Sequence, residues 1–340
     1  MTDEARISVY GSIDEIGREK WSEVISAAGA PAFYDYSFVH SYERIPLQPT
    51  EAFYYLVFGD PADAVLPAYL QSTDDPLGYV SGLGLPDRQP GDLVLMTHVA
   101  HCYDTLIPAR PGCLTRSLVD RACATLAELA REAGAKWYAF LNVDGAGPTA
   151  AHLAAAGLLR LPMTSRFNKS MTRYSSYDDL AAEVPARKTR WKHRMSVERA
   201  QAAGMVVYDA DPVREAADAV ELCRQTTARH GTAGYYPAHL HDFVASASEI
   251  IKITEVRFGD QLAAAAISLV DAGRFHLWAG GVDYEVAQRI PSAFALLLRP
   301  AVNEAIRSGR ATLEAGRSNE LTKRRFRLDP VPLFAYVGQV

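Results

Sequence analysis

The feature that most constrains the fold of this chain is an internal repeat in its order of elements. In each half, strand-like segments precede a long helix that ends at a glycine, and another strand follows directly. The matching segments are residues 130–141 (AREAGAKWYAFL) and residues 305–316 (AIRSGRATLEAG). Such a repeat suggests a duplicated α/β unit. The 340 residues are enough for two domains of roughly 150 residues each. We therefore predict an α/β (α+β) fold with two mixed-sheet domains in tandem.

Local patterns predict where these elements lie. In the first half we expect one long helix and several strands: strands Ala52–Phe58, Ala64–Gln71, Leu93–Thr97 and Trp137–Asn142, and helix Leu114–Ala133. In the second half the same patterns predict helix Pro212–Arg229, hairpin Ile250–Phe258 with Gln261–Val270, strand Arg274–Val282, helix Pro291–Ser308 and a short strand from Thr312. The opening strand of that half is expected over Arg166–Tyr174. The predicted domains are 1–165 and 166–340, with a last strand that can pack back on the first domain.

Composition excludes several classes of protein. Hydrophobic residues make up 49% of the chain and charged residues 22%, which is ordinary for a globular protein. The longest apolar runs fall short of the roughly 20 residues that span a bilayer, and the first residues (MTDEAR) are acidic, so we expect no membrane span and no secretory signal. The 4 cysteines are dispersed without a CxxC pair. We therefore expect a cytoplasmic protein without disulfides or structural zinc.

Basic side chains gather in two places although the net charge is −5. The segment 187–199 contains Arg187, Lys188, Arg190, Lys192, Arg194 and Arg199, opposed only by Glu198. On a helix these cations form two stripes, and Trp191 and Met195 between them are expected to pack the helix against the domain. A second cluster comprises Arg317, Lys323, Arg324, Arg325 and Arg327. Both clusters suit a polyanion such as a tRNA acceptor stem. The alternative is a solvated helix face with structural ion pairs.

Histidines and aromatic residues supply further candidate positions. In a predicted loop of the first half, reactive side chains gather at His98, His101, Cys102, Tyr103 and Asp104. His-x-x-His lacks a partner pair for zinc, so a substrate-lining loop is the better functional hypothesis, and packing and turn chemistry are the alternative. On the strand Arg274–Val282, His276 and Trp278 should share one face, which is either core or cleft.

Three stretches of the second half carry a resemblance to a known superfamily. They are the basic helix ARKTRWKHR (186–194), the strand end WAGGVDY (278–284), and LEAGR (313–317) followed by TKRRF (322–326). Together they resemble the tandem-GNAT superfamily over about residues 165–330. This superfamily includes Fem-type aminoacyl-tRNA-dependent transferases, relatives in antibiotic biosynthesis and related acyltransferase-like proteins. The resemblance implies two GNAT folds and acyl transfer to an amine.

The resemblance also implies roles for particular residues. Lys323 matches the family lysine that meets the acylated end of the donor, where it would stabilise developing negative charge. Glu314 lies where the family has an acidic residue before Gly-Arg; it could take the amine proton, or it could form a structural ion pair. Donor binding would then involve Arg187, Lys188, Arg190, Lys192, Arg194, Arg317, Arg324 and Arg325. Substrate binding would involve His98, His101, Tyr103, Asp104, Trp278, Asp283 and Tyr284.

The donor is the main open question at this stage. The usual coenzyme A pattern, Gln/Arg-x-x-Gly-x-Gly/Ala, is absent, because residues 286–292 read VAQRIPS. Arg289 and Ser292 could still contact a phosphate, although a loop cation and a helix N-cap are the simpler interpretations. The leading hypothesis is therefore an aminoacyltransferase that uses aminoacyl-tRNA, without a cofactor or metal. It would form an amide on an amine of a small molecule or a peptidoglycan precursor by direct attack. The alternatives are an acyl-CoA-dependent N-acyltransferase, a non-catalytic degenerate GNAT binding module and, on the histidines alone, a metal hydrolase.

Overall fold

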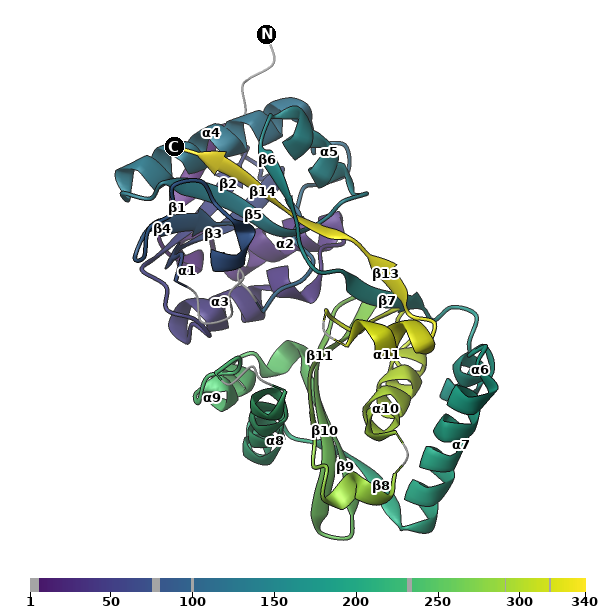
Figure 1. Ribbon diagram of the computed structural model, residues 1–340. Coiled ribbons are helices and arrows are strands. Elements are labelled where there is room, and N and C mark those ends of the chain that lie inside the picture. The colour runs from purple at the N-terminus through teal and green to yellow at the C-terminus, as the bar shows by residue number, and fades with distance from the viewer. Residues whose placement is uncertain (1–5, 75–79, 99–100, 231–233, 291, 318) are drawn as a thin grey trace. The chain divides into compact units, whose positions relative to one another are not determined.

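The computed structural model describes all residues except 1–5, 75–79, 99–100, 231–233, 291 and 318. The chain divides into two compact units (Figure 1). Unit 1 comprises Met1–Ser165 together with Val331–Val340, and unit 2 comprises Arg166–Pro330. Each unit contains a mixed seven-stranded sheet with helices, which confirms the predicted class and the tandem arrangement of two mixed sheets.

Unit 1 is built on a mostly antiparallel sheet. Its strands are β1 (Ile7–Tyr10), β2 (Ala52–Phe58), β3 (Ala64–Ser72), β4 (Leu93–Met96), β5 (Trp137–Asp144), β6 (Leu159–Pro162) and β14 (Leu333–Gln339). Its helices are α1 (Ile13–Ile16), α2 (Arg18–Ala28), α3 (Tyr36–Arg44), α4 (Arg116–Glu132) and α5 (Pro148–Ala155). The strand order is β1-β2-β3-β4-β5-β14-β6, in which β4 and β5 are parallel.

Helix α4 shows why the first half folds as its pattern predicts. Thr115 caps the helix, because its side-chain oxygen accepts a hydrogen bond from the backbone N–H of Leu118. The apolar residues of one face, including Leu126 and Ala130, join the core that covers the sheet. Gly134, at a φ of 71°, then lets the chain leave the helix in a left-handed conformation.

Unit 2 has the same plan. Its strands are β7 (Arg166–Ser170), β8 (Met205–Ala210), β9 (Ile251–Phe258), β10 (Gln261–Val270), β11 (Arg274–Val282), β12 (Thr312–Glu314) and β13 (Asp329–Val331). Its helices are α6 (Tyr177–Ala182), α7 (Arg187–Ala202), α8 (Ala216–Arg229), α9 (Leu240–Ser246), α10 (Ala293–Arg307) and α11 (Glu320–Arg325). The strand order is β13-β7-β12-β11-β10-β9-β8, in which β11 and β12 are parallel.

The two sheets match position by position, with one exchange. Strand β14 comes from the C-terminus of the chain but lies in the sheet of unit 1, between β5 and β6. The equivalent place in unit 2, beside β12, belongs to β7, which follows unit 1 in the sequence. The last strand of the chain, β14, thus completes the sheet of unit 1. Strand β7, which directly follows β6 in the sequence, completes the sheet of unit 2.

The sheet of unit 2 has helices on both faces. Helices α8 and α9 lie on one face, and α7 and α10 lie on the other (Figure 1). Strand β10 (QLAAAAISLV) is therefore an almost continuous apolar run, as expected for a strand buried on both sides. Gly281 of β11 permits close packing of α8, because an added Cβ there would lie 2.5 Å from the backbone of Leu222. Among the described residues, no helix is long and apolar enough to cross a membrane.

Some predicted elements differ from the observed ones at their ends. The opening strand of the second half stops at Ser170 rather than Tyr174, and α8 begins at Ala216 rather than Pro212. Helix α10 starts at Ala293, whereas its expected first residue, Pro291, lies outside the described residues. Ser292 does take the N-cap position of α10, but its side chain makes no capping hydrogen bond.

Candidate functional site

The parallel strands β11 and β12 pair over only a short stretch in the middle of the unit 2 sheet. They pair over three residues, from Arg274 with Thr312 to His276 with Glu314. Strand β12 then ends, whereas β11 continues to Val282. Among the described residues, no strand pairs with that edge of β11 beyond His276. The carboxyl half of β11 therefore has an edge without a strand partner, where the backbone N–H of Val282 donates to Oγ1 of Thr226 at 2.8 Å and the backbone oxygen of Val282 accepts from it at 3.3 Å.

A β-bulge lies in the same stretch of β11. Ile267 of β10 pairs with Ala279, and the next residue, Ser268, pairs with Leu277, so β11 contains one extra residue here. The extra residue is Trp278, which packs against Phe243 of α9 with ring centroids 5.9 Å apart. Bulges re-aim backbone and side-chain groups and are enriched next to active sites. The open edge and the bulge together mark this end of the sheet as a candidate site.

Glu314 lies at the end of β12 and is almost completely buried. Its Oε1 accepts a hydrogen bond from Nη1 of Arg166 at 2.5 Å, and Nδ2 of Asn168 lies 3.4 Å from the same oxygen. Both partners come from β7, which runs antiparallel to β12. The structure therefore places Glu314 in a buried ion pair, which compensates its charge in a region of low polarity. Its predicted role as the proton acceptor stays a prediction.

Lys323 is buried as well, with 4% of its surface exposed. Its Nζ donates a hydrogen bond to the backbone oxygen of Arg317 at 3.1 Å and lies 5.7 Å from the centre of the Phe167 ring. Burial, with a smaller contribution from the nearby positive charge of Arg317, lowers the pKa of Lys323 to about 7. Near neutral pH this side chain therefore exists in both its charged and its neutral form.

The two predicted catalytic residues lie on different faces of β7. Glu314 contacts Arg166 and Asn168, whereas Lys323 lies over Phe167, whose side chain points to the opposite face of the strand. Phe167 belongs to the core under α10. The structure thus brings Lys323 to the α10 side of the sheet and Glu314 to the α8 and α9 side.

Two side chains, one from the turn and one from α7, bond backbone amides of the segment between β11 and α10. Oδ1 of Asp283 accepts hydrogen bonds from the backbone N–H groups of Glu285 at 2.8 Å and Val286 at 3.0 Å. The backbone N–H of Ser292, at the start of α10, donates to Oγ of Ser196 at 3.0 Å. Three backbone amides of this segment, those of Glu285, Val286 and Ser292, are therefore engaged, and the Asp283 carboxylate adds negative charge to the turn.

Other predicted substrate residues near this turn also have partners. Oη of Tyr284 lies 2.8 Å from Nε2 of His230, and the guanidinium of Arg229 lies 4.5 Å from the Tyr284 ring centre. Trp278 is buried, as is His276, whose Nε2 lies 2.8 Å from Oδ2 of Asp271. Both side chains point to the α8 and α9 face, where they form part of the core.

Helix α7 carries the basic segment as predicted, but it packs differently. Its predicted donor residues are all exposed: Arg187, Lys188, Arg190, Lys192 and Arg194. The expectation that Trp191 packs the helix against the domain is wrong, because 47% of Trp191 is exposed. The residues that bury the helix are His193, Ser196 and Ala200. The apolar side of the helix is thus offset from the position that the residue pattern suggested.

His193 is the anchor of α7 that the sequence did not reveal. Its Nδ1 lies 2.7 Å from the hydroxyl of Tyr177, and its ring centre lies 3.7 Å from that of Phe326. Burial lowers its pKa to about 4, so the ring is neutral at pH 7. A histidine within a run of cations looks like one more basic residue, and only the tertiary contacts show that it is part of the core.

The exposed face of α7 borders a hollow of about 730 Å³, which we call the α7 groove. Trp191, Arg187, Arg190 and Arg194 line it. Nη1 of Arg190 donates to the backbone oxygen of Val184 at 2.6 Å, so this arginine also secures the turn before the helix. Arg194 has only an exposed contact of 3.5 Å with Glu198. Such exposed pairs contribute little. Asp178 and Glu198 also line the groove, so its four arginines, which include Arg299, outnumber its two carboxylates and give it a net positive charge.

The residues of the second basic cluster differ in exposure: some point into solvent, and others take part in packing. Arg324 pairs with Glu320 at 2.7 Å on the surface of α11, and Arg325 is exposed. Arg317 is half-buried and contributes its backbone oxygen to Lys323. Arg317 is therefore the member of the cluster whose charge acts on Lys323, and a role of the cluster in donor binding stays a prediction.

The histidine segment of the first half lies in the core of unit 1. His98, His101, Tyr103 and Asp104 are all buried. Burial lowers the pKa of His98 to about 3, and its ring lies 4.5 Å from that of Tyr34. The described residues contain no group of side chains that could hold a metal ion. These positions are typical of packing, and a role in substrate binding stays a prediction.

The same segment closes the parallel pair of unit 1. Strand β4 ends at Met96, but β5 continues to Asp144. The chain returns to this edge of β5: Thr105 forms a bridge with Val143, and Nδ2 of Asn142 donates to the backbone oxygen of Cys102 at 2.8 Å. In unit 1 the chain itself therefore occupies the edge next to the parallel pair.

Comparisons with known proteins agree with this description. Residues 187–324 match the family described as "Acetyltransferase (GNAT) domain". The crystal structure of FemX is similar over 97% of this chain and 97% of that chain, with a TM-score of 0.64 and 10% identity. A tandem GNAT protein from the clavulanic acid biosynthesis pathway is similar over 99% of this chain and 98% of that chain, with a TM-score of 0.57 and 15% identity. The structure of L-PGS from Bacillus licheniformis is similar over 96% of this chain and 92% of that chain, with a TM-score of 0.57 and 10% identity. No curated protein matches the chain.

The chain has the tandem GNAT fold. The GNAT family match includes both α7 and the segment from β12 to α11, so the candidate residues Glu314 and Lys323 lie within it. Arg166 and Asn168 lie before the match, on the strand that is exchanged between the two GNAT units. This position explains why sequence reasoning did not pair them with Glu314.

Proposed function

We propose that this protein transfers an aminoacyl group from aminoacyl-tRNA to the amine of a small molecule or a peptidoglycan precursor. The acyl-transfer chemistry is proposed for unit 2, at the open end of β11 and β12. The observation that carries the proposal is a buried lysine, Lys323, with a pKa of about 7, in a GNAT fold whose exposed basic helix can hold a polyanion.

Lys323 suits proton transfer because its neutral form is populated at pH 7. An amine nucleophile must lose a proton when it attacks an ester, and a group whose pKa is near the working pH is the most effective acceptor. Glu314 is a weaker candidate because Arg166 holds its carboxylate in a buried ion pair. In the charged form, Lys323 would instead stabilise the carbonyl oxygen, as the family resemblance implies.

The proposed reaction is a direct aminolysis. The acceptor nitrogen forms a bond to the carbonyl carbon of the aminoacyl ester, and Lys323 takes a proton from that nitrogen. The carbon–oxygen ester bond then breaks, and the ribose oxygen of the tRNA leaves with the proton that Lys323 returns, so Lys323 is neutral again at the end. No acylated enzyme is formed in this sequence, so an acyl-enzyme that is competent for transfer would contradict it.

The choice of donor rests on the turn before α10. An acyl-CoA donor needs free backbone amides for its pyrophosphate, and here Asp283 occupies two of them with a carboxylate. The α7 groove offers cations together with an exposed indole, and aromatic rings on a cationic surface suit single-stranded nucleic acid. These features favour the 3′ end of a tRNA over coenzyme A.

The choice of unit rests on the two parallel pairs. In unit 1, residues 102–105 bond to the edge of β5 next to the parallel pair. In unit 2, β12 is the strand that ends first, and the carboxyl half of β11 then has no strand partner among the described residues. An acylated donor can therefore approach the sheet of unit 2 without displacing a segment of that sheet.

The donor is tested by binding. Purified protein is titrated with an aminoacyl-tRNA pool and, separately, with acetyl-CoA over a series of salt concentrations. Tight tRNA binding that weakens with salt, with a slope that falls by about 1 in Arg194→Gln, supports the proposal. Arg116→Gln, on α4 of unit 1, is the matched control and should leave the slope unchanged. Binding of acetyl-CoA without binding of tRNA would favour the acyl-CoA-dependent transferase instead.

The role of Lys323 is tested by comparing Lys323→Gln with Lys323→Arg in a transfer assay. If Lys323 is the proton acceptor, both variants lose activity, because arginine stays protonated. If Lys323 acts as a cation at the carbonyl oxygen, Lys323→Arg retains much of the activity. Full activity in both variants would remove Lys323 from the reaction. Absence of transfer in the wild type with either donor would favour a non-catalytic binding protein.

A further inference from the structure

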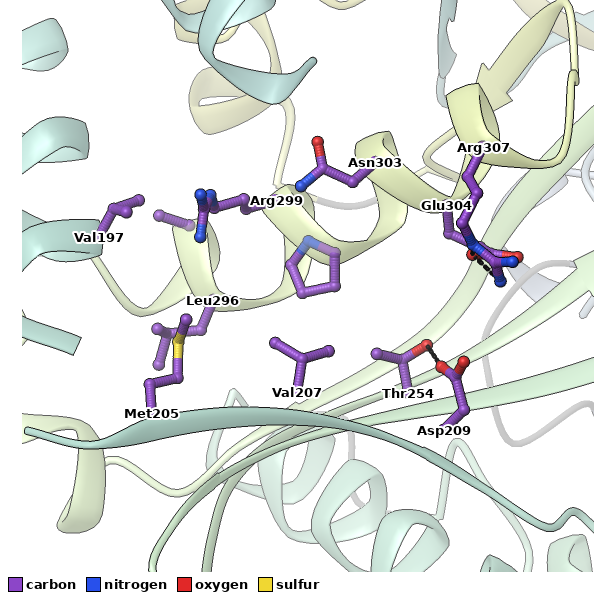
Figure 2. A pocket seen from close by; sticks show the side chains of 12 residues that line it. Val197, Met205, Val207, Asp209, Thr254, Leu296, Arg299, Asn303, Glu304 and Arg307 are labelled. Carbon is purple, nitrogen blue, oxygen red and sulfur yellow. Dashed lines mark hydrogen bonds and ion pairs between the residues drawn. The ribbon is translucent and has the colours of Figure 1, made fainter. Parts of the chain in front are cut away.

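Unit 2 contains a second cavity, away from Lys323. It has a volume of about 260 Å³ and lies between the edge strand β8 and helix α10, with contributions from α7 and β9 (Figure 2). We call it the β8–α10 pocket. Neither the proposed acyl transfer nor the donor interactions account for it.

One part of the β8–α10 pocket is apolar. Met205 and Val207 project into it from β8, and Leu296 faces them from α10 (Figure 2). Pro300 of α10 also lines the pocket. Val207 is 46% exposed although it faces inward from the strand. An edge strand that leaves such side chains open to water gains stability when an apolar ligand covers them.

The acidic side chains of the pocket already have partners. Glu304 accepts a hydrogen bond from Nε of Arg307 at 2.7 Å and also pairs with Lys252. Asp209 lies 3.5 Å from Oγ1 of Thr254. Figure 2 shows these two acidic groups at one end of the pocket, away from Arg299. Arg307 and Lys252 therefore already balance the charge of Glu304, and a ligand need not bring a cation to this end of the pocket.

Arg299 differs from these groups. Its Nε is buried, and no described group accepts a hydrogen bond from it. Arg299 lines both the β8–α10 pocket and the α7 groove, and Val197 does the same. The apolar pocket and the cationic groove therefore share a wall, with a guanidinium at the boundary.

We propose that the β8–α10 pocket binds a single-chain anionic lipid, whose alkyl chain lies against Val207 and Leu296 and whose phosphate lies at Arg299. The apolar wall fits the chain, and Arg299 supplies fork-like donors that match a phosphate. The α7 groove adds positive charge from Arg187 and Arg194 on the side where the head group emerges. The pocket is distinct from the proposed acyl-transfer centre, because Lys323 does not line it, although it borders the α7 groove that is proposed for the donor.

The test uses isothermal titration of the full-length protein with decyl phosphate below its micelle concentration. Hexyl phosphate, inorganic phosphate and decylamine are the comparison ligands. Each buried methylene should tighten binding about fourfold, equivalent to about 0.8 kcal/mol, so decyl phosphate should bind about 200-fold more tightly than hexyl phosphate. Equal binding of the two phosphates, or tighter binding of decylamine, would overturn the proposal.

Matched variants locate the chain. Val207→Glu places a charge on the apolar wall, and Val206→Glu places the same charge one residue away, on the other face of β8. Both valines are exposed, so neither change should prevent folding. We expect Val207→Glu to weaken decyl phosphate binding at least tenfold and Val206→Glu to leave it unchanged. An equal effect of the two variants would show that the chain does not lie in this pocket.

A second pair of variants locates the phosphate. Arg299→Gln should weaken decyl phosphate binding about tenfold or more, because it removes a charged hydrogen-bond donor. Arg214→Gln, an exposed arginine before α8, is the control and should bind as the wild type does. Lys323→Gln should also bind normally, which separates this site from the acyl-transfer site. Unchanged binding in Arg299→Gln would refute the assignment of the phosphate.

Discussion

Replacing Lys323 by methionine should remove a pH-dependent cost from the stability of unit 2. Burial lowers the pKa of Lys323 to about 7 from its ordinary value of 10.5. Between these pH values the unfolded chain holds the proton and the folded chain does not, so the free energy of unfolding rises with pH across this window. Below pH 7 both states bind the proton and the full cost of burying the charge is present. Above pH 10.5 the cost disappears.

The size of the effect follows from the shift in pKa. One pKa unit corresponds to about 1.4 kcal/mol, so the cost is about 4 kcal/mol at pH 7 and about 2 kcal/mol at pH 9. Methionine has a similar length and carries no charge. The stability advantage of Lys323→Met over the wild type should therefore shrink by about 2 kcal/mol between these two pH values. A gain of this kind is typical of sites at which function opposes stability.

The assay is urea unfolding at pH 7, 8 and 9, followed by tryptophan fluorescence. Lys192→Met is the matched control, because Lys192 is exposed on α7 and its replacement should give no pH-dependent difference. Arg317→Ala should reduce the pH dependence slightly, since Arg317 makes the smaller contribution to the lowered pKa. A stability difference between Lys323→Met and wild type that stays constant from pH 7 to 9 would refute the reasoning.

Three further changes test the packing of unit 2. Arg166→Ala should destabilise the fold by about 3–5 kcal/mol in chemical unfolding, because it leaves the buried Glu314 charge uncompensated, and the double variant with Glu314→Leu should recover most of that loss. Gly281→Ala should lower the melting temperature, since an added Cβ would lie 2.5 Å from the backbone of α8; wild-type stability would show that α8 can move away. Tyr177→Phe should cost about 1–3 kcal/mol by removing the partner of His193 Nδ1, and no loss would mean that the nitrogen finds another partner.

The fold was predictable where its signals are local. The Gly-terminated helices, the hairpin of β9 and β10 and the apolar run of β10 follow from residue order alone. The exchange of β7 and β14 was harder, because both strands lie far in sequence from the strands beside them. The residue pattern of a short strand does not indicate which of two similar sheets the strand will join.

The site was predictable only in part, for a physical reason. Residue type and spacing placed Lys323 and Glu314 in the right segments, but burial is a tertiary property. The lowered pKa of Lys323 results from packing, and the ion pair of Glu314 involves Arg166, which lies 148 residues away in sequence. Trp191 shows the converse: helical periodicity assigned it to the buried side, and the contacts of His193 turned the helix differently.

The two units show how a duplicated fold can give unequal sites. Both contain a parallel pair in which one strand runs past the end of its partner. In unit 1 the extra length of β5 bonds to residues 102–105, and the buried histidines of that segment become part of the core. In unit 2 the extra length of β11 carries a bulge and has no strand partner among the described residues, and the same unit contains Lys323, whose pKa is lowered. A closed edge satisfies its own backbone groups and favours stability, whereas an open edge leaves them for a ligand.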